Sequence, residues 1–343
     1  MRILIDAMGG DNAPGEIVRG AVDAQKEFGV DITLYGRAEE VRPFLRECGV
    51  ADDDAHLTLI DAPEVISMED DPATAARKKP NSSMSMALKA LHLGEGDAVI
   101  SAGSTGALLS GATLIVRRIR GIRRACFGPV LPNGKNGVLL IDCGANAECT
   151  PEYLLQFAFM GSFHAKKVMG CQSPRVGLLN VGTEDTKGDT LRHETFKLLK
   201  EADAEGRIRF IGNVEGTDVF GGGVEVVVSD GFTGNVLLKT TEGVIKYMMK
   251  SLKGVFYAST LNKLAAAVLK KDLKKMAKSM DVNEVGGTAL IGISKPVIKA
   301  HGSSNAASIF AAIRQAKLFV ESGTIGDICA NIDYMKLKSE ENG

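Results

Sequence analysis

Short apolar runs alternate with longer segments of helical periodicity along almost the whole chain. Most of the runs are nearly continuous in Val, Ile and Leu, a composition typical of strands buried on both faces of a sheet. They predict strands at Arg2–Asp6, Asp31–Tyr35, His56–Asp61, Ala98–Ser101, Val138–Asp142, Arg175–Val181, Ile208–Gly212 and Val224–Ser229. Helical segments between strands favour parallel crossovers. The pattern therefore predicts an α/β fold, a three-layer open sandwich with a largely parallel, doubly wound sheet.

The chain length bears on domain organisation. A chain of 343 residues suggests about two domains by size alone, and a single large α/β domain also accommodates it. We predict one such domain over residues 1–335. The polar stretch Lys336–Gly343 is expected to be a flexible tail, residues 336–343.

One segment departs from the alternating pattern. On a helical projection of Leu252–Met280, apolar side chains fall on one side and lysines on the other, with an interruption near Ser259 and Thr260. We expect a projecting amphipathic helical hairpin over residues 250–282 that binds anionic lipid reversibly. Its expected membrane contacts are Leu261, Leu264, Val268 and Leu269. The alternative is an apolar stripe packed against the protein core.

Polar loops follow several predicted strands. Those rich in Gly, Asn, Asp and Thr are Asp6–Pro14, Asp142–Asn146, Asn180–Gly188, Gly212–Asp218 and Asp230–Lys239. Turn chemistry and helix capping explain each loop separately. In open α/β sheets, however, the ligand site lies beyond the carboxyl ends of the strands. Together, the loops predict a polar cleft with many backbone and amide donors.

The turn after the fourth predicted strand has the layout of an anion site. Gly103 and Gly106 let the backbone turn tightly. Ser104 and Thr105 add hydroxyl donors, and the predicted helix Ala107–Arg118 directs its positive N-terminal end toward the turn. A phosphate group fits this arrangement. The alternative is a plain strand-to-helix turn in which Ser104 caps the helix.

Composition narrows the class of protein. Apolar residues make up 45% and charged residues 24%, and the formal net charge is -1, so we expect no nucleic-acid partner. The six cysteines show neither C-x-x-C pairs nor the Cys/His spacing of zinc sites, so we expect reduced thiols, no metal and no cofactor. No apolar run is long enough to span a bilayer, and a cytoplasmic enzyme is expected.

The polar loops carry a family resemblance. The chain resembles the PlsX family, the bacterial acyl-carrier-protein:phosphate acyltransferases, in a set of segments that follow in this order: Asp6–Pro14, Ser101–Ala107, Asp142–Asn146, Thr183–Gly188, Gly212–Asp218, Asp230–Lys239 and His301–Ser304. The resemblance covers nearly the whole chain. It implies an isocitrate/isopropylmalate dehydrogenase-like fold and a homodimer with membrane affinity. It also implies transfer of a long-chain fatty acyl group from acyl carrier protein to inorganic phosphate, which forms acyl phosphate for phospholipid synthesis.

That reaction needs donors and cations more than a nucleophile, because phosphate itself attacks the thioester. Lys187 stands on a glycine-flanked loop, where its ammonium can reach the phosphate or the developing oxyanion; a solvated surface lysine is the alternative. Asn235 is expected to begin a helix and to point its amide into the cleft, with N-capping as the competing use. His301 is expected to orient phosphate or act as a base, against a purely structural role.

Further candidates are assigned to binding and to ordering the cleft. Contacts with phosphate or substrate are expected from Gly103, Ser104, Thr105, Gly106, Asn146, Asn213 and Gly234. Ionised carboxylates would repel phosphate, so Asp6, Asp11 and Asp142 are expected to order the cleft through hydrogen bonds. An acyl-enzyme formed on Cys143 is an alternative mechanism.

The implied partners follow from the same resemblance. Acyl carrier protein is acidic, and the densest arginine cluster, Arg117, Arg118, Arg120, Arg123 and Arg124, is expected to steer it unless these residues form only a solvated face. The resemblance also implies peripheral contact with an anionic membrane, where the membrane glycerol-3-phosphate acyltransferase is a further expected partner. Two other functions stay open: a phosphotransacetylase-like acyl-coenzyme A:phosphate transferase, and a membrane-docked scaffold for carrier protein.

Overall fold

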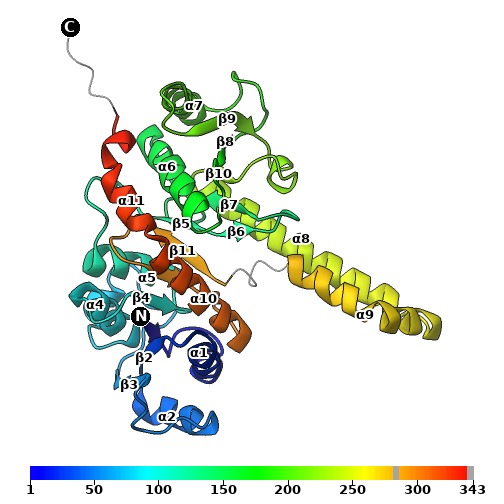
Figure 1. Cartoon of the computed structure of the whole chain (residues 1–343). Coiled ribbons are helices and arrows are strands. Elements are labelled where there is room, and N and C mark those ends of the chain that lie inside the picture. Colours follow the sequence, from blue (N-terminus) through cyan, green and yellow to red (C-terminus); the bar gives the residue numbers. More distant parts are fainter. Residues whose placement is uncertain (281–285, 338–343) are drawn as a thin grey trace.

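The computed structural model describes residues 1–280 and 286–337 of the chain. Its strands form two mostly parallel sheets (Figure 1). The seven-stranded sheet has the order β3 (Leu57–Asp61), β2 (Asp31–Gly36), β1 (Arg2–Asp6), β4 (Ala98–Ser101), β12 (Val297–Lys299), β11 (Thr288–Ile291), β5 (Cys126–Gly128). The five-stranded sheet has the order β6 (Val130–Leu131), β7 (Val138–Ile141), β10 (Val226–Val228), β8 (Arg175–Leu179), β9 (Arg209–Val214). Strands β5, β6 and β11 contribute the antiparallel pairings.

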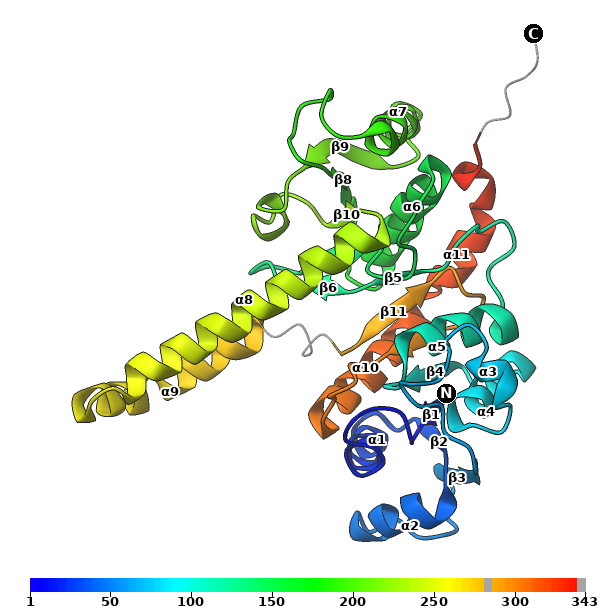
Figure 2. The same cartoon turned by 180° about the vertical axis from the view of Figure 1, so that it is seen from behind.

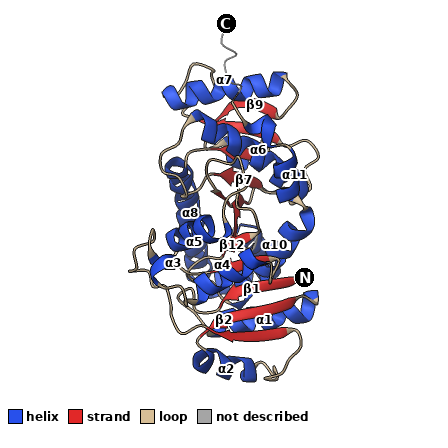
Figure 3. Cartoon of the chain, turned by 90° about the vertical axis from the view of Figure 1, so that its left-hand side faces the viewer, coloured by secondary structure: helices blue, strands red, loops and turns tan. Residues whose placement is uncertain are grey.

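Helices lie on both faces of the sheets, and two of the helices form a projecting pair (Figures 1 and 2). The helices are α1 (Gly15–Phe28), α2 (Ala38–Glu47), α3 (Ala75–Lys78), α4 (Ser83–Leu93), α5 (Thr105–Gly111), α6 (Pro151–Lys167), α7 (Thr190–Ala204), α8 (Gly231–Tyr257), α9 (Thr260–Met280), α10 (Ala306–Ser322) and α11 (Thr324–Ala330). From the side, the strands of the two sheets follow one another along the molecule with helices to either side (Figure 3). This arrangement gives three layers.

Two hydrophobic cores, one on each face of the sheets, run across both sheets. Along β1, Ile3 joins one core and Leu4 the other, because successive side chains point to opposite faces. Along β7, Ile141 joins the first core and Leu140 the second. Both cores are therefore continuous over the junction between the sheets. The predicted α/β class with a largely parallel sheet is confirmed, with its strands divided between two sheets.

The predicted strands correspond to β1, β2, β3, β4, β7, β8, β9 and β10, with shifts of a few residues at their ends. Strands β5, β6, β11 and β12 were missed. Each is two to four residues long and is bordered by Gly or Pro, which interrupts the apolar run. Three of them lie where the two sheets meet, and β12 lies beside β4.

The helix predicted at Ala107–Arg118 begins earlier and ends irregularly. Helix α5 starts at Thr105 with Ser104 as its N-cap, and the chain continues as a π-helical turn over Ala112–Val116. Arg117 then adopts a positive φ of 76°, which stops the helix. Two kinds of helical turn thus occupy the segment where one helix was expected.

The predicted hairpin is confirmed as α8 and α9, which project far from the body of the molecule (Figures 1 and 2). The turn lies at Ala258 and Ser259, where Asn262 donates its side-chain amide to the carbonyl of Val255 at 2.7 Å. The first arm begins earlier than predicted, at Gly231. Residues 281 and 282 of the predicted hairpin and residues 338–343 of the predicted tail lie outside the described residues. Within the described ranges, no helix combines the length and apolarity needed to cross a membrane.

Candidate active site

The carboxyl ends of strands from both sheets border one small cleft. Its volume is about 210 Å³. Its lining residues are Thr105, Phe127, Pro129, Val130, Cys143, Asn235, Leu238, Lys239, Glu242, Gly287, Thr288, Lys299, Ala300, His301 and Gly302. The seven-stranded sheet supplies the loops after β4 and β12, and the five-stranded sheet supplies the loop after β7. Helix α8 lies against the cleft with the face that carries Asn235 and Lys239.

Helix α8 is docked by two glycines. A Cβ on Gly234 would lie 1.9 Å from the carbonyl oxygen of Asp142, and one on Gly231 would lie 2.6 Å from the carbonyl oxygen of Asn146. Only glycine permits so close an approach of helix and loop. This contact sets the position of Asn235 one residue later, and the expected contact of Gly234 with phosphate or substrate stays a prediction.

Asn235 lies in the second turn of α8 and does not begin the helix. The N-cap is Asp230, whose carboxylate accepts from the backbone N–H of Thr233 at 2.9 Å. Arg192 donates to the other oxygen of the same carboxylate. The predicted competition between capping and catalysis thus falls away, and the amide of Asn235 lines the cleft near Gly144.

Asp142 is a fully buried hydrogen-bond acceptor. One carboxylate oxygen accepts from the backbone N–H of Phe127 at 2.9 Å and of Ala145 at 3.3 Å. The other accepts from Asn146, both from its backbone N–H at 2.7 Å and from its side-chain amide at 3.0 Å. Burial raises the pKa of this carboxyl to about 6, while the N–H donors oppose that rise. Asp142 ties the loop after β7 to β5 through these hydrogen bonds, while its expected part in ordering a phosphate site stays a prediction.

Asn146 is committed to the same network. Its side-chain amide also donates to the carbonyl of Ala125 at 2.8 Å, so both amide hydrogens are used inside the protein. In this arrangement the side-chain amide of Asn146 has no free N–H for the contact with phosphate or substrate that was predicted for it.

Asp6 orders the loops of the seven-stranded sheet. Its carboxylate accepts from the hydroxyls of Ser83 and Ser101, each at 2.6 Å, and from the backbone N–H of Met8 at 3.2 Å. Burial raises the pKa of this carboxyl, and the hydroxyl donors oppose that effect. Asp11 joins the same region, because its backbone N–H donates to the carbonyl of Gly302 at 2.8 Å.

The glycine turn after β4 packs closely against the loop after β1. A Cβ on Gly9 would lie 2.6 Å from the backbone nitrogen of Gly103, and that N–H donates to Ser101. Ser104 is buried and caps α5 by accepting from the N–H of Ala107. Thr105 is the residue of this turn that lines the cleft, whereas Gly106 packs against Pro72.

His301 lies at the cleft with one ring nitrogen engaged. Its Nδ1 lies 2.9 Å from the hydroxyl of Ser303 and accepts from the backbone N–H of the same residue at 3.2 Å. Partial burial lowers the pKa of the imidazole, and the nearby charge of Lys239 lowers it further. His301 is thus held mainly neutral at pH 7, with Nε2 opposite the anchored nitrogen.

Lys187 does not line the cleft that Asn235 and His301 line. Its loop and α8 border a second cavity, lined by Asn180, Gly188, Asp189, Arg192, Thr233, Val236, Leu237 and Thr240, among others. Helix positions three or four apart share one face, so Val236 and Thr240 face this cavity while Asn235 and Lys239 face the cleft. Of the three predicted catalytic residues, Asn235 and His301 line the cleft and Lys187 does not.

Asn213 contacts the loop that carries Lys187. Its side-chain amide donates to the carbonyl of Glu184 at 2.9 Å, and its Oδ1 is buried without a hydrogen-bond partner among the described residues. Asn213 thus fixes the loop that carries Lys187 and does not line the cleft.

The alternative nucleophile Cys143 lines the cleft but is buried. Burial raises the pKa of its thiol well above the ordinary value, and the charge of Asp142 adds to the effect. A thiol that stays protonated is a poor nucleophile. This environment disfavours an acyl-enzyme on Cys143.

Sequence reasoning missed three charged residues of the cleft: Lys299, Lys239 and Glu242. Lys299 ends β12 and is only 9% exposed. A lysine directly after two apolar residues, in Val297–Lys299, was the available signal. It was overlooked because β12 itself was not recognised as a strand.

The family model described as "Fatty acid synthesis protein" matches residues 1–326. The chain belongs to this family. It is 47% identical to a phosphate acyltransferase of Oceanobacillus iheyensis over 99% of this chain and 100% of the relative. It is 48% identical to a phosphate acyltransferase of a Geobacillus species over 96% of this chain and 97% of the relative. The resemblance to the PlsX family is thereby confirmed.

Solved structures confirm the fold class. A phosphotransacetylase from Streptococcus pyogenes superposes with a TM-score of 0.63 at 18% identity, covering 95% of this chain and 94% of that one. A 4-hydroxythreonine-4-phosphate dehydrogenase from Klebsiella pneumoniae gives 0.54 at 14% identity, covering 93% and 99%. At these identities the likeness extends to the fold alone.

Proposed function

We propose that this protein transfers a long-chain fatty acyl group from the thioester of acyl carrier protein to inorganic phosphate. Phosphate acyltransferases as near-full-length relatives support an acyltransferase with phosphate as acceptor. The observation that carries the assignment of the site is the cleft at the junction of the sheets. It gathers two lysines, an amide, a hydroxyl and an imidazole around a volume suited to a small anion, and its carboxylate Glu242 is paired with Lys239.

The reaction needs no group beyond its two substrates. An oxygen of hydrogen phosphate attacks the thioester carbonyl, the carbon–sulfur bond breaks, and an acyl phosphate forms. The proton of the phosphate passes to the leaving thiolate, so the carrier protein is released as a free thiol. Asn235 donates to the developing oxyanion, and His301 relays the proton through Nε2. The role of Lys187 stays a prediction, since its loop borders the neighbouring cavity and Lys187 does not line the cleft.

The assay that tests this proposal follows free carrier-protein thiol released from palmitoyl-acyl carrier protein, with and without inorganic phosphate. Release by the wild type should require phosphate. Asn235→Ala and Lys187→Ala should fold normally and lose at least about tenfold in turnover, the effect of removing a charge-stabilising donor. Full activity in either variant would remove that residue from the mechanism.

The donor distinguishes the alternatives. Release of thiol from acetyl-coenzyme A but not from the carrier protein would move the assignment to a phosphotransacetylase. Binding of the carrier protein without release from either donor would favour a scaffold. The fold shared with a phosphotransacetylase makes the first comparison necessary.

Arginines near the junction supply a docking surface for an acidic carrier protein. Arg118 and Arg124 line a cavity of about 480 Å³ that also reaches Asn146 of the cleft network. Arg123 pairs with Glu152 at 3.0 Å, so it is partly neutralised. Arg118 and Arg124 are the members of the cluster that steer the partner.

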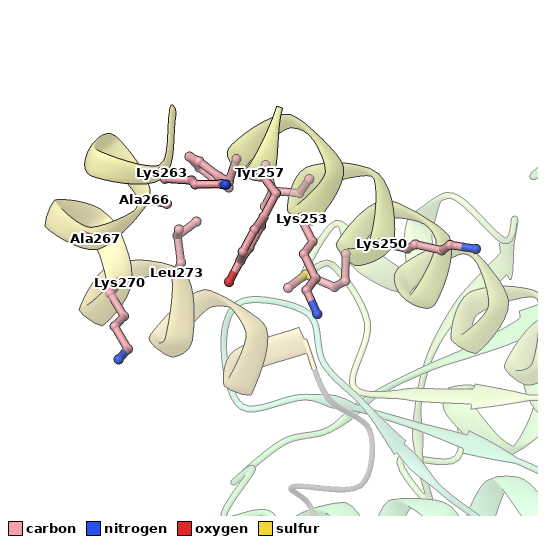
Figure 4. A pocket seen from close by; sticks show the side chains of 11 residues that line it. Lys250, Lys253, Tyr257, Lys263, Ala266, Ala267, Lys270 and Leu273 are labelled. Carbon is pink, nitrogen blue, oxygen red and sulfur yellow. The ribbon is translucent and has the colours of Figure 1, made fainter. Parts of the chain in front are cut away.

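The hairpin is the surface for peripheral membrane association. Leu261, Leu264 and Val268 are 78%, 62% and 83% exposed, and Leu269 is 43% exposed. Between the two helices, Tyr257 and Leu273 point into an apolar groove, while the ammonium groups of Lys250 and Lys270 point away from it (Figure 4). Apolar insertion and lysine attraction together suit anionic lipid.

The exposed apolar residues of α8 suit a second copy of the chain. Val244, Tyr247, Met248 and Val255 are all more than half exposed. Their spacing places them along one side of the helix. A homodimer covers this stripe, and a docked dimer at the membrane delivers acyl phosphate to a membrane glycerol-3-phosphate acyltransferase.

A further inference from the structure

A buried lysine stands at the inner wall of the cleft. Lys299 is the last residue of β12 and is 9% exposed. Its ammonium donates to the carbonyl oxygen of Ala102 at 3.2 Å and to that of Ala300. In the described part of the chain no carboxylate forms an ion pair with it. An ammonium has three N–H donors, so two carbonyls leave one N–H for another acceptor.

The charges around Lys299 do not neutralise it. Asp6 and Asp11 on the loop after β1 attract it, while Lys239 on α8 repels it. The carboxylate of Asp6 is itself occupied by two serine hydroxyls. Glu242 of α8 pairs with Lys239 at 3.0 Å. Burial lowers the pKa of Lys299 to about 8, which reflects a cation without a full counter-charge.

The other donors around the cleft converge on the same space. Thr105, Asn235 and His301 line it together with Lys299 and Lys239. A buried cation next to a polar cavity is stabilised when an anion enters that cavity. The volume of about 210 Å³ suits a small anion and not a fatty acyl chain.

We propose that Lys299 is the cation that holds inorganic phosphate in the cleft, with its ammonium aimed by the carbonyls of Ala102 and Ala300. This inference rests on the proposed function for the identity of the anion. It places phosphate at the loops after β4 and β12, between Lys299 and the face of α8 that carries Asn235. The acyl thioester then approaches from the open side of the cleft.

Lys299→Met tests the assignment, because methionine keeps an unbranched side chain and removes the charge. We expect the KM for phosphate to rise at least about tenfold, the loss of one charge-assisted hydrogen bond, with the KM for the acyl donor unchanged. Lys295→Met is the matched control. Lys295 precedes β12, and its ammonium lies near Gly94 at the opposite end of the strand from Lys299. An unchanged KM for phosphate in Lys299→Met would overturn the proposal and leave the proposed function standing.

A binding measurement separates the two hypotheses. Phosphate, compared with chloride at equal ionic strength, should raise the melting temperature of the wild type and of Lys295→Met but not of Lys299→Met. Wild-type protein without phosphate-dependent thiol release would sink the proposed function, while this shift would still test Lys299 as an anion site.

The wild type alone provides a second test, which holds if Lys299→Met does not fold. An ammonium with a lowered pKa loses its charge as the pH rises through about 8. The phosphate-induced shift in melting temperature should therefore shrink between pH 7 and pH 9.5. A shift that stays constant over this range, or that Lys299→Met retains, would contradict the assignment.

Discussion

At the scale of single residues, two histidines show how differently the same side chain is used. His301 is anchored by Ser303 at the cleft, whereas His164 of α6 is fully buried and stacks edge-on against Phe319. Neither ring nitrogen of His164 has a hydrogen-bond partner among the described residues. Burial lowers the pKa of His164 to about 4 from the ordinary 6.5. The sequence does not distinguish the two, because both follow apolar or small residues.

His164 should make the protein acid-labile. In the unfolded chain His164 is protonated below about pH 6.5, whereas in the folded chain it stays neutral down to about pH 4. The free energy of unfolding should therefore fall as the pH drops from 6.5 to 4, by up to about 3 kcal/mol. His164→Leu should abolish this dependence and raise the free energy of unfolding at pH 7 by about 1–3 kcal/mol, because it removes a buried polar group without partners. Urea unfolding at pH 7 and pH 5 measures both effects. His92→Leu, at an exposed position of α4, is the control; an equal effect there would refute the argument.

Among the elements, α8 runs from the cleft into the projecting hairpin. One of its glycines, Gly234, packs against the loop after β7, whereas another, Gly243, does not. Gly234 lies where a Cβ would meet the carbonyl oxygen of Asp142 at 1.9 Å, whereas a Cβ on Gly243 would meet nothing within 4 Å. Gly234→Ala should therefore push α8 off the loop and lower the free energy of unfolding by more than about 3 kcal/mol. Gly243→Ala, in the same helix, should raise it by about 0.5–1 kcal/mol through helix propensity. Thermal or urea unfolding of the pair settles the matter, and equal effects would show that α8 does not depend on this contact.

The same helix explains what the sequence could and could not predict. Strands such as β1 and β10 were predictable because apolar continuity is a local signal. The polar loops Asp6–Pro14 and Asp142–Asn146 were predictable because they follow those strands. The relation of Lys187 to Asn235 was not, since it depends on which face of α8 meets which sheet. Lys299 was missed because its strand holds only two consecutive apolar residues, Val297 and Ile298, before the lysine itself.

At the scale of the whole molecule, the hairpin projects far from the body (Figures 1 and 2), and its second helix carries the exposed side chains of Leu261, Leu264 and Val268. Membrane binding and acyl transfer should therefore be separable by mutation. Val268 is 83% exposed on α9, and burial of a valine in lipid contributes roughly 1.5–3 kcal/mol. Val268→Glu loses that term and adds repulsion from anionic headgroups.

We expect Val268→Glu to reduce sedimentation with vesicles of anionic phospholipid at least about tenfold at low salt. Its rate with carrier-protein substrate in solution should be unchanged, because the cleft lies in the body of the molecule. Leu93→Glu is the matched control, since Leu93 is 62% exposed at the end of α4 and undergoes the same change of charge. Equal loss of sedimentation in both variants would mean that net charge governs binding. Failure of the wild type to sediment would mean that the exposed apolar residues of α9, Leu261, Leu264 and Val268, do not bind anionic lipid. Loss of sedimentation in Val268→Glu but not in Leu93→Glu would identify α9 as the membrane-binding arm. Added salt should weaken binding of the wild type as well, because the ionic contribution of the lysines is screened while the apolar contribution is not.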